Sequence, residues 1–426
     1  FKDFSTTGDP RNADKTVEGE IVFGGYGVTA PGQKYDDYAT IDAKGKIVAL
    51  FSGAPAPFPN AVRAHHASTP VKFANAARHG AVGIIYLISP AQASRMSWDI
   101  IASHAKSGAM QWADADGAPH GVPPSVSTSI GLNLETTRLL LGRQANSIFD
   151  SIERGNLRSR SLGYRARIHL VSTHERKQSP NVVGLLRGSD PRLRDEYVVY
   201  TSHLDHIGVT APVDGDAINN GAFDNASGIA AMLEIARALA AAKPRRSILF
   251  IATTAEEHGM KGADYFANNP TVPIGDIVAN INIDMLVMTH AMRDLLPFGA
   301  ETSDLGDVAR SVARQMKIRL ADDPFPEEMI FVRSDQIAFV RQGVPAIYVG
   351  PGFDAAAPDV NGEREYADWL RTRYHSPKDD LEQPIDWSAA LLLTEFDYRV
   401  GLTVANGDER PRWKRGDFFG ETYGRR

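Results

Sequence analysis

The second half of the sequence alternates short apolar runs with longer segments of helical periodicity. Four runs rich in β-branched and aromatic residues are predicted to be strands, at residues 197–202, 247–254, 277–285 and 345–349. Between the first two, apolar residues recur at helical spacing, at Ile229, Met232, Leu233, Ala236 and Leu239. This alternation predicts an α/β fold in which a mixed, mostly parallel β-sheet lies between layers of helices.

Side chains that bind metals follow three of these predicted strands. His203 comes directly after the first strand, Glu256 and Glu257 follow the second, and Asp284 lies at the end of the third. In open α/β sheets, residues beyond the carboxyl ends of neighbouring strands meet in one crevice. Gathering an imidazole and several carboxylates there is unfavourable unless a metal holds them. We therefore expect a metal site at this edge of the sheet.

Asp224 stands just before the helical segment, where Asn225 or Ser227 can cap the helix. Free N–H groups and the helix dipole favour a carboxylate at this position, so Asp224 is expected to stay ionised. An ionised carboxylate can offer one oxygen to each of two cations. The position therefore suits a bridge between two metals.

The adjacent acids Glu256 and Glu257 predict two different roles, one as general base and one as metal ligand. Two divalent cations about 3.5–4 Å apart can share a water, lower its pKa and polarise a scissile carbonyl group. Neighbouring side chains of an extended chain point in opposite directions, so one acid can bind metal while the other faces the water. We assign Glu256 as general base and Glu257 as ligand, an order that spacing alone does not fix. Asp205 is expected to accept the second N–H of His203. The predicted mechanism is attack by a metal-bridged hydroxide.

Five stretches of this region resemble one known family. They are His203–Gly208 (HLDHIG), Asn220–Gly228 (NGAFDNASG), Thr254–Glu257 (TAEE), Asn282–Met285 (NIDM) and Tyr374–Asp379 (YHSPKD). In this order they resemble the zinc exopeptidases that include bacterial secreted aminopeptidases and glutamate carboxypeptidase. The resemblance covers about the C-terminal half of the chain and implies the phosphorylase/hydrolase-like fold of these enzymes.

The resemblance also implies two zinc ions per chain. One zinc would be bound by His203 and Asp284, the other by Glu257 and His375, and Asp224 would bridge them. With no cysteine in the chain, zinc ligands must be histidine and carboxylate side chains.

Further roles follow from the same resemblance. Glu256 would be the general base, Asp205 would support a ligand, and the phenol of Tyr374 would help to stabilise the tetrahedral intermediate. Many members of the family carry histidine where this chain has Gln336, near the cleft. Because glutamine carries no charge, substrate recognition is expected to differ there.

The first part of the chain has a different pattern of residues. Short β-branched runs separated by Gly and Pro predict a β-rich module with a few helices. The segments 46–50, 72–86 and 122–126 resemble the protease-associated domain, which implies a role in substrate selection. We assign residues 1–19 to the catalytic domain, 20–170 to the protease-associated domain and 171–426 to the zinc peptidase domain.

Composition excludes several other classes of protein. The net charge of −6 is spread along the chain, so no nucleic-acid partner is indicated. Membrane spans require about 20 consecutive apolar residues, and no stretch reaches this length. Neither Gly-x-Ser-x-Gly nor His-Glu-x-x-His is present, which disfavours serine hydrolases and single-zinc helical proteases. The chain begins with Phe1 rather than Met, so we expect a leader upstream and a secreted or periplasmic location.

An aminopeptidase acting on peptide substrates is the preferred interpretation. A carboxypeptidase or dipeptidase of the glutamate carboxypeptidase type stays open, and Arg333 and Arg341 could bind a substrate carboxylate in that case. A single-zinc glutaminyl cyclase and a receptor-like binding module are disfavoured because every two-metal ligand is present. The ten other histidines, including His206, show no partner pattern and are interpreted as structural. Residue preference and oligomeric state are not encoded in any motif.

Overall fold

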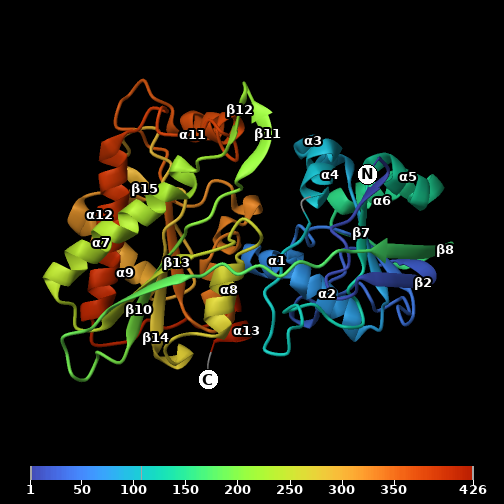
Figure 1. Ribbon diagram of the computed structural model, residues 1–426, viewed down its shortest axis with the longest axis horizontal. Coiled ribbons are helices and arrows are strands. Elements are labelled where there is room, and N and C mark those ends of the chain that lie inside the picture. Colours follow the sequence, from blue (N-terminus) through green and yellow to red (C-terminus); the bar gives the residue numbers. More distant parts are fainter. Residues whose placement is uncertain (1, 107, 425–426) are drawn as a thin grey trace. The chain divides into compact units, whose positions relative to one another are not determined.

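The structure is a computed structural model that describes residues 2–106 and 108–424 (Figure 1). The chain divides into two compact units, residues 1–177 (unit 1) and residues 178–426 (unit 2). Among the described residues, no helix combines the length and the apolar character needed to cross a lipid bilayer.

Unit 1 is built on a six-stranded sheet with the order β1, β7, β6, β5, β2, β8. The strands are Phe4–Ser5 (β1), Asp14–Phe23 (β2), Ile47–Phe51 (β5), Gly83–Leu87 (β6), Ser129–Leu132 (β7) and Arg160–Val171 (β8); Thr29–Ala30 (β3) and Tyr35–Asp36 (β4) form a separate pair. The helices are Asn60–Ala67 (α1), Thr69–Arg78 (α2), Pro90–Arg95 (α3), Trp98–Lys106 (α4), Leu134–Leu141 (α5) and Ala145–Glu153 (α6). The central strand β5 is parallel to β2 and β6 and is buried throughout.

The first 19 residues belong to unit 1 rather than to the catalytic domain, to which we assigned them. Phe4 pairs with Leu132 between β1 and β7, and Val17 pairs with Ile168 between β2 and β8. The β2–β8 ladder is long and antiparallel, so the N-terminal segment is held by the end of the same unit. The unit also extends past residue 170, because the N–H of Ser172 donates to the carbonyl oxygen of Ala13.

Unit 2 contains a seven-stranded sheet with the order β16, β15, β17, β14, β10, β13, β9. The strands are Val182–Leu186 (β9), Tyr197–His203 (β10), Ser247–Thr253 (β13), Ile277–Asn282 (β14), Asp294–Phe298 (β15), Arg319–Leu320 (β16) and Ala346–Pro351 (β17); Val209–Val213 (β11) and Asp216–Ile218 (β12) form a hairpin. Strands β13, β10, β14 and β17 are parallel, while β9 and β15 pair antiparallel with their neighbours. The sheet is therefore mixed and mostly parallel, as predicted.

Helices cover both faces of the unit 2 sheet. They are Ser227–Ala242 (α7), Lys261–Asn268 (α8), Leu305–Met316 (α9), Gln336–Arg341 (α10), Gly362–Thr372 (α11), Trp387–Asn406 (α12) and Phe418–Tyr423 (α13). Val198 and Tyr200 of β10 pack with α7, α9 and α12, whereas Val199 packs with α8 and α10 on the opposite face. Figure 1 shows α7, α9 and α12 on one side of the strands and α8 on the other. Burial on both faces explains the continuous apolar runs in the sequence.

The buried Arg246 ties the start of β13 to the end of α12. Its Nε donates to Glu196 Oε2 at 2.7 Å, and its Nη1 donates to the carbonyl oxygens of Val404 and Gly407 at 2.8 and 2.6 Å. We expect Arg246→Ala to lower the free energy of unfolding by about 3–5 kcal/mol, because Glu196 and both carbonyls lose a buried, charged donor. Urea unfolding followed by circular dichroism measures the effect.

Arg410 provides the matched control for Arg246. Its Nε also pairs with Glu196, at 2.8 Å, but its side chain is 45% exposed. Arg410→Ala is expected to cost less than about 1 kcal/mol, as exposed ion pairs do. Equal losses from the two variants would contradict the role given to burial.

Candidate metal centre

Three parallel strands of unit 2 end at the same edge of the sheet. His203 is the last residue of β10 and is aligned with Thr253, the last residue of β13. Strand β14 ends two residues before Asp284. Glu256 and Glu257 lie in the loop that follows β13. The fold therefore brings the predicted ligands of three strands to one edge, as expected from their order in the sequence.

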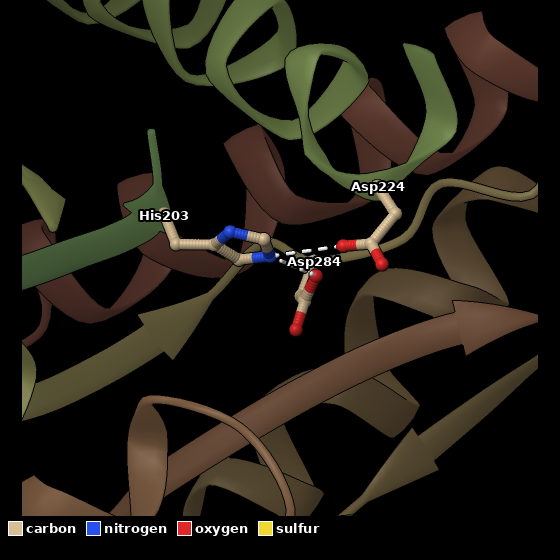
Figure 2. A group of neighbouring side chains, drawn as sticks. All are labelled: His203, Asp224 and Asp284. Carbon is tan, nitrogen blue, oxygen red and sulfur yellow. Dashed lines mark hydrogen bonds and ion pairs between the residues drawn. The ribbon is translucent and has the colours of Figure 1, made fainter. Parts of the chain in front are cut away.

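His203, Asp284 and one oxygen of Asp224 form a first group of predicted ligands, called the first metal site. The Nε2 atom of His203 lies 3.1 Å from Asp224 Oδ1 and 3.1 Å from Asp284 Oδ1. Figure 2 shows the imidazole pointing toward the two carboxylates. All three side chains are buried, and their ligand atoms lie within 4.8 Å of one another.

Glu257, His375 and the other oxygen of Asp224 form a second group, called the second metal site. The Nε2 atom of His375 lies 3.3 Å from Asp224 Oδ2 and 3.1 Å from Glu257 Oε2. Asp224 thus directs Oδ1 to the first site and Oδ2 to the second. This is the arrangement that a carboxylate bridging two cations requires.

The distances between donor atoms fit zinc at both sites. In a tetrahedral site with zinc bonds of about 2.0–2.1 Å, two donor atoms stand about 3.3 Å apart. The four contacts of His203 and His375 with carboxylate oxygens measure 3.1, 3.1, 3.3 and 3.1 Å. Among the described residues, the buried Nε2 of His375 also has no hydrogen-bond partner, although it faces two carboxylates. Imidazole and carboxylate donors at this spacing are suited to zinc.

When no cation is bound, protonated imidazoles neutralise the negative charge of these carboxylates. Burial lowers the pKa of both histidines, but the neighbouring carboxylates outweigh it: they raise the pKa of His203 well above its usual value and that of His375 to about 9. Burial also disfavours ionised Asp224, yet the nearby imidazoles of His203 and His375 hold the pKa of Asp224 below its usual range. Zinc must displace the protons of the imidazoles, so its binding is expected to weaken as the pH falls.

Two side chains hold the loop that carries Asp224. The carboxylate of Asp379 accepts the N–H groups of Phe223, at 2.9 Å, and of Asp224, at 3.0 Å. Asn225 donates to the carbonyl oxygen of Ile283 at 3.1 Å and accepts the N–H of Gly228 at 3.1 Å, in the first turn of α7. Asn225 therefore binds the loop both to the first turn of α7 and to the end of β14, although the N-cap residue of α7 is Ala226 rather than Asn225 or Ser227.

Asp379 is expected to act on metal binding through this loop. In Asp379→Asn, an amide nitrogen replaces one of the two carboxylate oxygens that accept these backbone N–H groups. We expect zinc affinity to fall by about 10–100-fold, as is usual when a group that orients a ligand is removed. Competition with a chromogenic chelator measures the affinity. The control is Asp380→Asn, because that carboxylate accepts the N–H of Glu382 instead; an equal fall there would contradict the role of Asp379.

Asp205 differs in detail from its predicted role. The Nδ1 atom of His203 donates to the main-chain oxygen of Asp205 at 2.9 Å, whereas the nearest carboxylate oxygen is 4.0 Å away. The carboxylate accepts the backbone N–H of Glu256 at 3.0 Å instead. Since a carbonyl can only accept, Nδ1 carries the proton and Nε2 is free to bind metal. Asp205 therefore orients the imidazole through its backbone and the general-base candidate through its side chain.

The carboxyl group of Glu256 lies in an environment that suits proton transfer. Burial raises its pKa well above the usual value, opposed by the charge of His203 and reinforced by Asp284 and Asp335. A carboxylate with a raised pKa is a stronger base at neutral pH.

Tyr374 and Gln336 occupy the surroundings of the ligands. The ring of Tyr374 stacks on the imidazole of His375, with centroids 3.9 Å apart, and burial raises the pKa of the phenol. Tyr374 is thus a protonated donor next to the second metal site. Gln336 is fully buried at the start of α10 and donates to the carbonyl oxygen of Phe331 at 2.8 Å. Its side chain packs inside the unit.

Two residues near the ligands were missed by the sequence analysis. Ser334 donates to Asp284 Oδ2 at 2.5 Å and accepts from Asn282 Nδ2 at 2.8 Å. His206, which we interpreted as structural, places Nδ1 2.7 Å from Glu257 Oε1. Its position three residues after His203, in the loop that follows β10, was the available signal.

The geometry agrees with comparisons to known proteins. The sequence profile described as peptidase family M28 matches residues 181–397. A probable zinc metalloprotease of Leptosphaeria maculans is 28% identical over 260 residues, which are 54% of this chain and 58% of the relative. A probable leucine aminopeptidase 2 of Aspergillus fumigatus is 26% identical over 229 residues, 51% of this chain and 42% of the relative. The matched regions thus span about half the length of these relatives.

One solved structure similar to the chain is the aminopeptidase from Aneurinibacillus sp. strain AM-1. The two have 18% sequence identity and a TM-score of 0.46, with 98% of this chain and 80% of the other covered.

Proposed function

Because the chain belongs to peptidase family M28, we propose that it is an aminopeptidase that binds two zinc ions and removes N-terminal residues from peptides. The observation that carries this proposal is the position of Asp224, which presents one oxygen to each of two groups of ligands. A single-zinc site would leave one of these oxygens, and the imidazole that faces it, without a cation.

The ligands divide between the two zinc ions. His203 and Asp284 would hold one ion, Glu257 and His375 the other, and Asp224 both. When bound, the two ions supply positive charge that lowers the pKa of a water molecule and polarises the carbonyl group of the substrate.

Glu256 is the proposed general base. Its carboxylate takes a proton from the attacking water, and the resulting carboxylic acid gives a proton to the leaving amine when the peptide bond breaks. Burial and the neighbouring carboxylates give Glu256 the proton affinity that both steps need. The bond from its N–H to Asp205 fixes the backbone from which the carboxylate is presented.

Tyr374 is the proposed donor to the carbonyl oxygen of the substrate. Stacking on His375 holds the ring beside the second metal site, and burial keeps the phenol protonated. A donor fixed in advance stabilises the oxygen as it gains negative charge.

An apolar pocket near the ligands suggests the class of substrate. Its lining includes Leu296, Phe298, Phe325, Tyr348, Phe353 and Tyr366. Tyr348 of β17 is aligned with Asn282, which stands two residues before Asp284. A pocket with aromatic walls near the ligands favours an apolar side chain at the N-terminus of the substrate.

A peptide panel tests the proposed activity. Peptides with Leu or Phe at the free N-terminus, and the same peptides with an acetylated N-terminus, are incubated with the protein and the products identified by mass. We expect loss of the N-terminal residue from the free peptides only, about two zinc equivalents per chain, and no hydrolysis after chelation. Shortening from the C-terminus in both sets would instead identify a carboxypeptidase.

A dipeptidase is the second candidate, and Arg333 favours it. Burial raises the pKa of Tyr374 and Tyr366, and the positive charge of Arg333 opposes this rise in both. The charge of Arg333 thus acts on Tyr374 beside the second metal site, and its guanidinium, which pairs with Glu328 at 3.3 Å, is a candidate to bind the carboxylate of a short peptide. In that case Arg333→Ala would raise KM for dipeptides but not for their C-terminal amides.

The arrangement of β5, α2 and β6 supports the further proposal that unit 1 is a protease-associated domain. These three elements occupy segments 46–50 and 72–86, two of the three that carry the resemblance to that domain. Removal of substrate discrimination, with hydrolysis of small substrates retained, is the expected effect of disrupting unit 1.

A further inference from the structure

His206 lies beside the second metal site although no ligand role was assigned to it. It stands in the loop between β10 and β11, and its side chain is 9% exposed. Its Nδ1 atom is 2.7 Å from Glu257 Oε1 and 3.9 Å from Asp224 Oδ2. Its ring meets that of His375 edge-on, with centroids 5.6 Å apart.

The two histidines contact different oxygens of Glu257. His375 Nε2 is 3.1 Å from Oε2, whereas His206 Nδ1 is 2.7 Å from Oε1. A carboxylate that is held by one oxygen presents the other in a fixed direction. Oε2 of Glu257 is therefore directed toward His375.

His206, Asp224 and Glu257 have ligand atoms within 4.8 Å of one another and could hold a metal ion, but the individual distances favour a different role for His206. Donor atoms bound to one zinc ion stand about 3.3 Å apart in a tetrahedral site. The contacts of His375 with Glu257 and Asp224, at 3.1 and 3.3 Å, match this spacing. The 2.7 Å contact of His206 is shorter and is that of a hydrogen bond to a charged oxygen, while its distance to Asp224 is longer.

The surroundings of His206 fix its ring and its tautomer. Gly221 has a left-handed φ of +65°, and a Cβ atom there would stand 2.8 Å from His206 Cγ. Glycine therefore makes room for the ring. Among the described residues, the buried Nε2 has no hydrogen-bond partner, so the proton is better placed on Nδ1, where Glu257 accepts it.

We propose that His206 is a positioning residue of the second metal site, which donates Nδ1–H to Glu257 Oε1 and so directs Oε2 to the metal. This inference rests on the proposed binding of two zinc ions. Removing the donor is expected to weaken zinc binding at the second site by about 10–100-fold, the range found when partners that orient metal ligands are lost. The first site should retain its affinity.

Three substitutions of His206 separate the possible roles. The amide nitrogen of His206→Asn reaches the place of Nδ1, whereas that of His206→Gln reaches the place of Nε2. We therefore expect His206→Gln and His206→Ala to lose zinc affinity at one site, and His206→Asn to stay within a few-fold of wild type. The exposed neighbour His258 supplies the control, because His258→Ala should bind both zinc ions as wild type does.

The measurements are stepwise zinc titration against a chromogenic chelator and the visible spectrum of the cobalt-substituted protein. Variants saturated with cobalt should give the wild-type spectrum, because the ligands are unchanged. The retained first site shows in the same titration that each variant is folded.

Other results would overturn the inference. An altered cobalt spectrum, with equal losses in all three variants, would make His206 a ligand. Wild-type zinc affinity in His206→Ala would remove any role. A wild-type protein that binds two zinc ions but hydrolyses no peptide would refute the proposed function and leave the inference standing, whereas one that lacks a second zinc would refute both.

Discussion

Asp224→Ala is expected to lose both zinc ions and to lower kcat/KM for an aminoacyl substrate on the order of 10⁴-fold, the size of loss seen when one member of a catalytic unit is removed. The reason is that this carboxylate serves both sites, with Oδ1 3.1 Å from His203 Nε2 and Oδ2 3.3 Å from His375 Nε2. Its removal takes one ligand from each zinc ion. Metal analysis after dialysis and steady-state kinetics measure the two effects.

Two further variants sharpen the test of Asp224. Asp224→Asn keeps one oxygen and is expected to bind about one zinc, because the amide nitrogen has no free electron pair with which to bind the second zinc ion. Asp214→Ala removes an exposed carboxylate that pairs with Lys378 and should keep both zinc ions. If Asp224→Ala binds two zinc ions with wild-type affinity, Asp224 does not bridge them.

The sheet of unit 2 could be predicted because its strands are buried on both faces. The predicted strands 197–202, 247–254 and 345–349 correspond closely to β10, β13 and β17. The third prediction, 277–285, is too long, since β14 ends at Asn282. Beyond that point the side chain of Asn225, rather than a neighbouring strand, binds the backbone. It accepts the N–H of Met285 and donates to the carbonyl oxygen of Ile283. Asp284 therefore lies in a loop, where apolar periodicity does not show the end of the strand.

Three of the proposed ligands, His203, Glu257 and Asp284, could be predicted because they lie at or after strand ends. His375 was predicted only from the family resemblance, and the supporting groups could not be predicted. Asp379 binds the backbone of Phe223 and Asp224 across more than 150 residues of sequence. The carboxylate of Asp205 was expected to accept a hydrogen bond from His203 but accepts the N–H of Glu256 instead. Spacing along the chain places such groups near the site without showing which of two neighbouring donors they meet. Their contacts depend on how loops from different strands pack together.

Glu256→Gln is expected to lower kcat by about 10²–10⁴-fold while both zinc ions remain bound, because general acid–base catalysis contributes a factor of that size. Glutamine has nearly the same shape as glutamate but no basic oxygen for the proton of water. The bond from the backbone N–H to Asp205 is unaffected by the change. KM should stay within a few-fold of wild type, since the substitution removes an interaction made during the reaction.

Glu257→Gln is the matched comparison, because it separates base from ligand between adjacent acids of equal size. Glu257 Oε2 lies 3.1 Å from His375 Nε2, and Oε1 lies 2.7 Å from His206 Nδ1. Its amide would lose one of these contacts and weaken zinc binding at the second site. Kinetics and stepwise zinc titration on both variants therefore give opposite patterns if the assignment is right. Full zinc binding with lost turnover in Glu257→Gln, together with zinc loss in Glu256→Gln, would reverse the two roles.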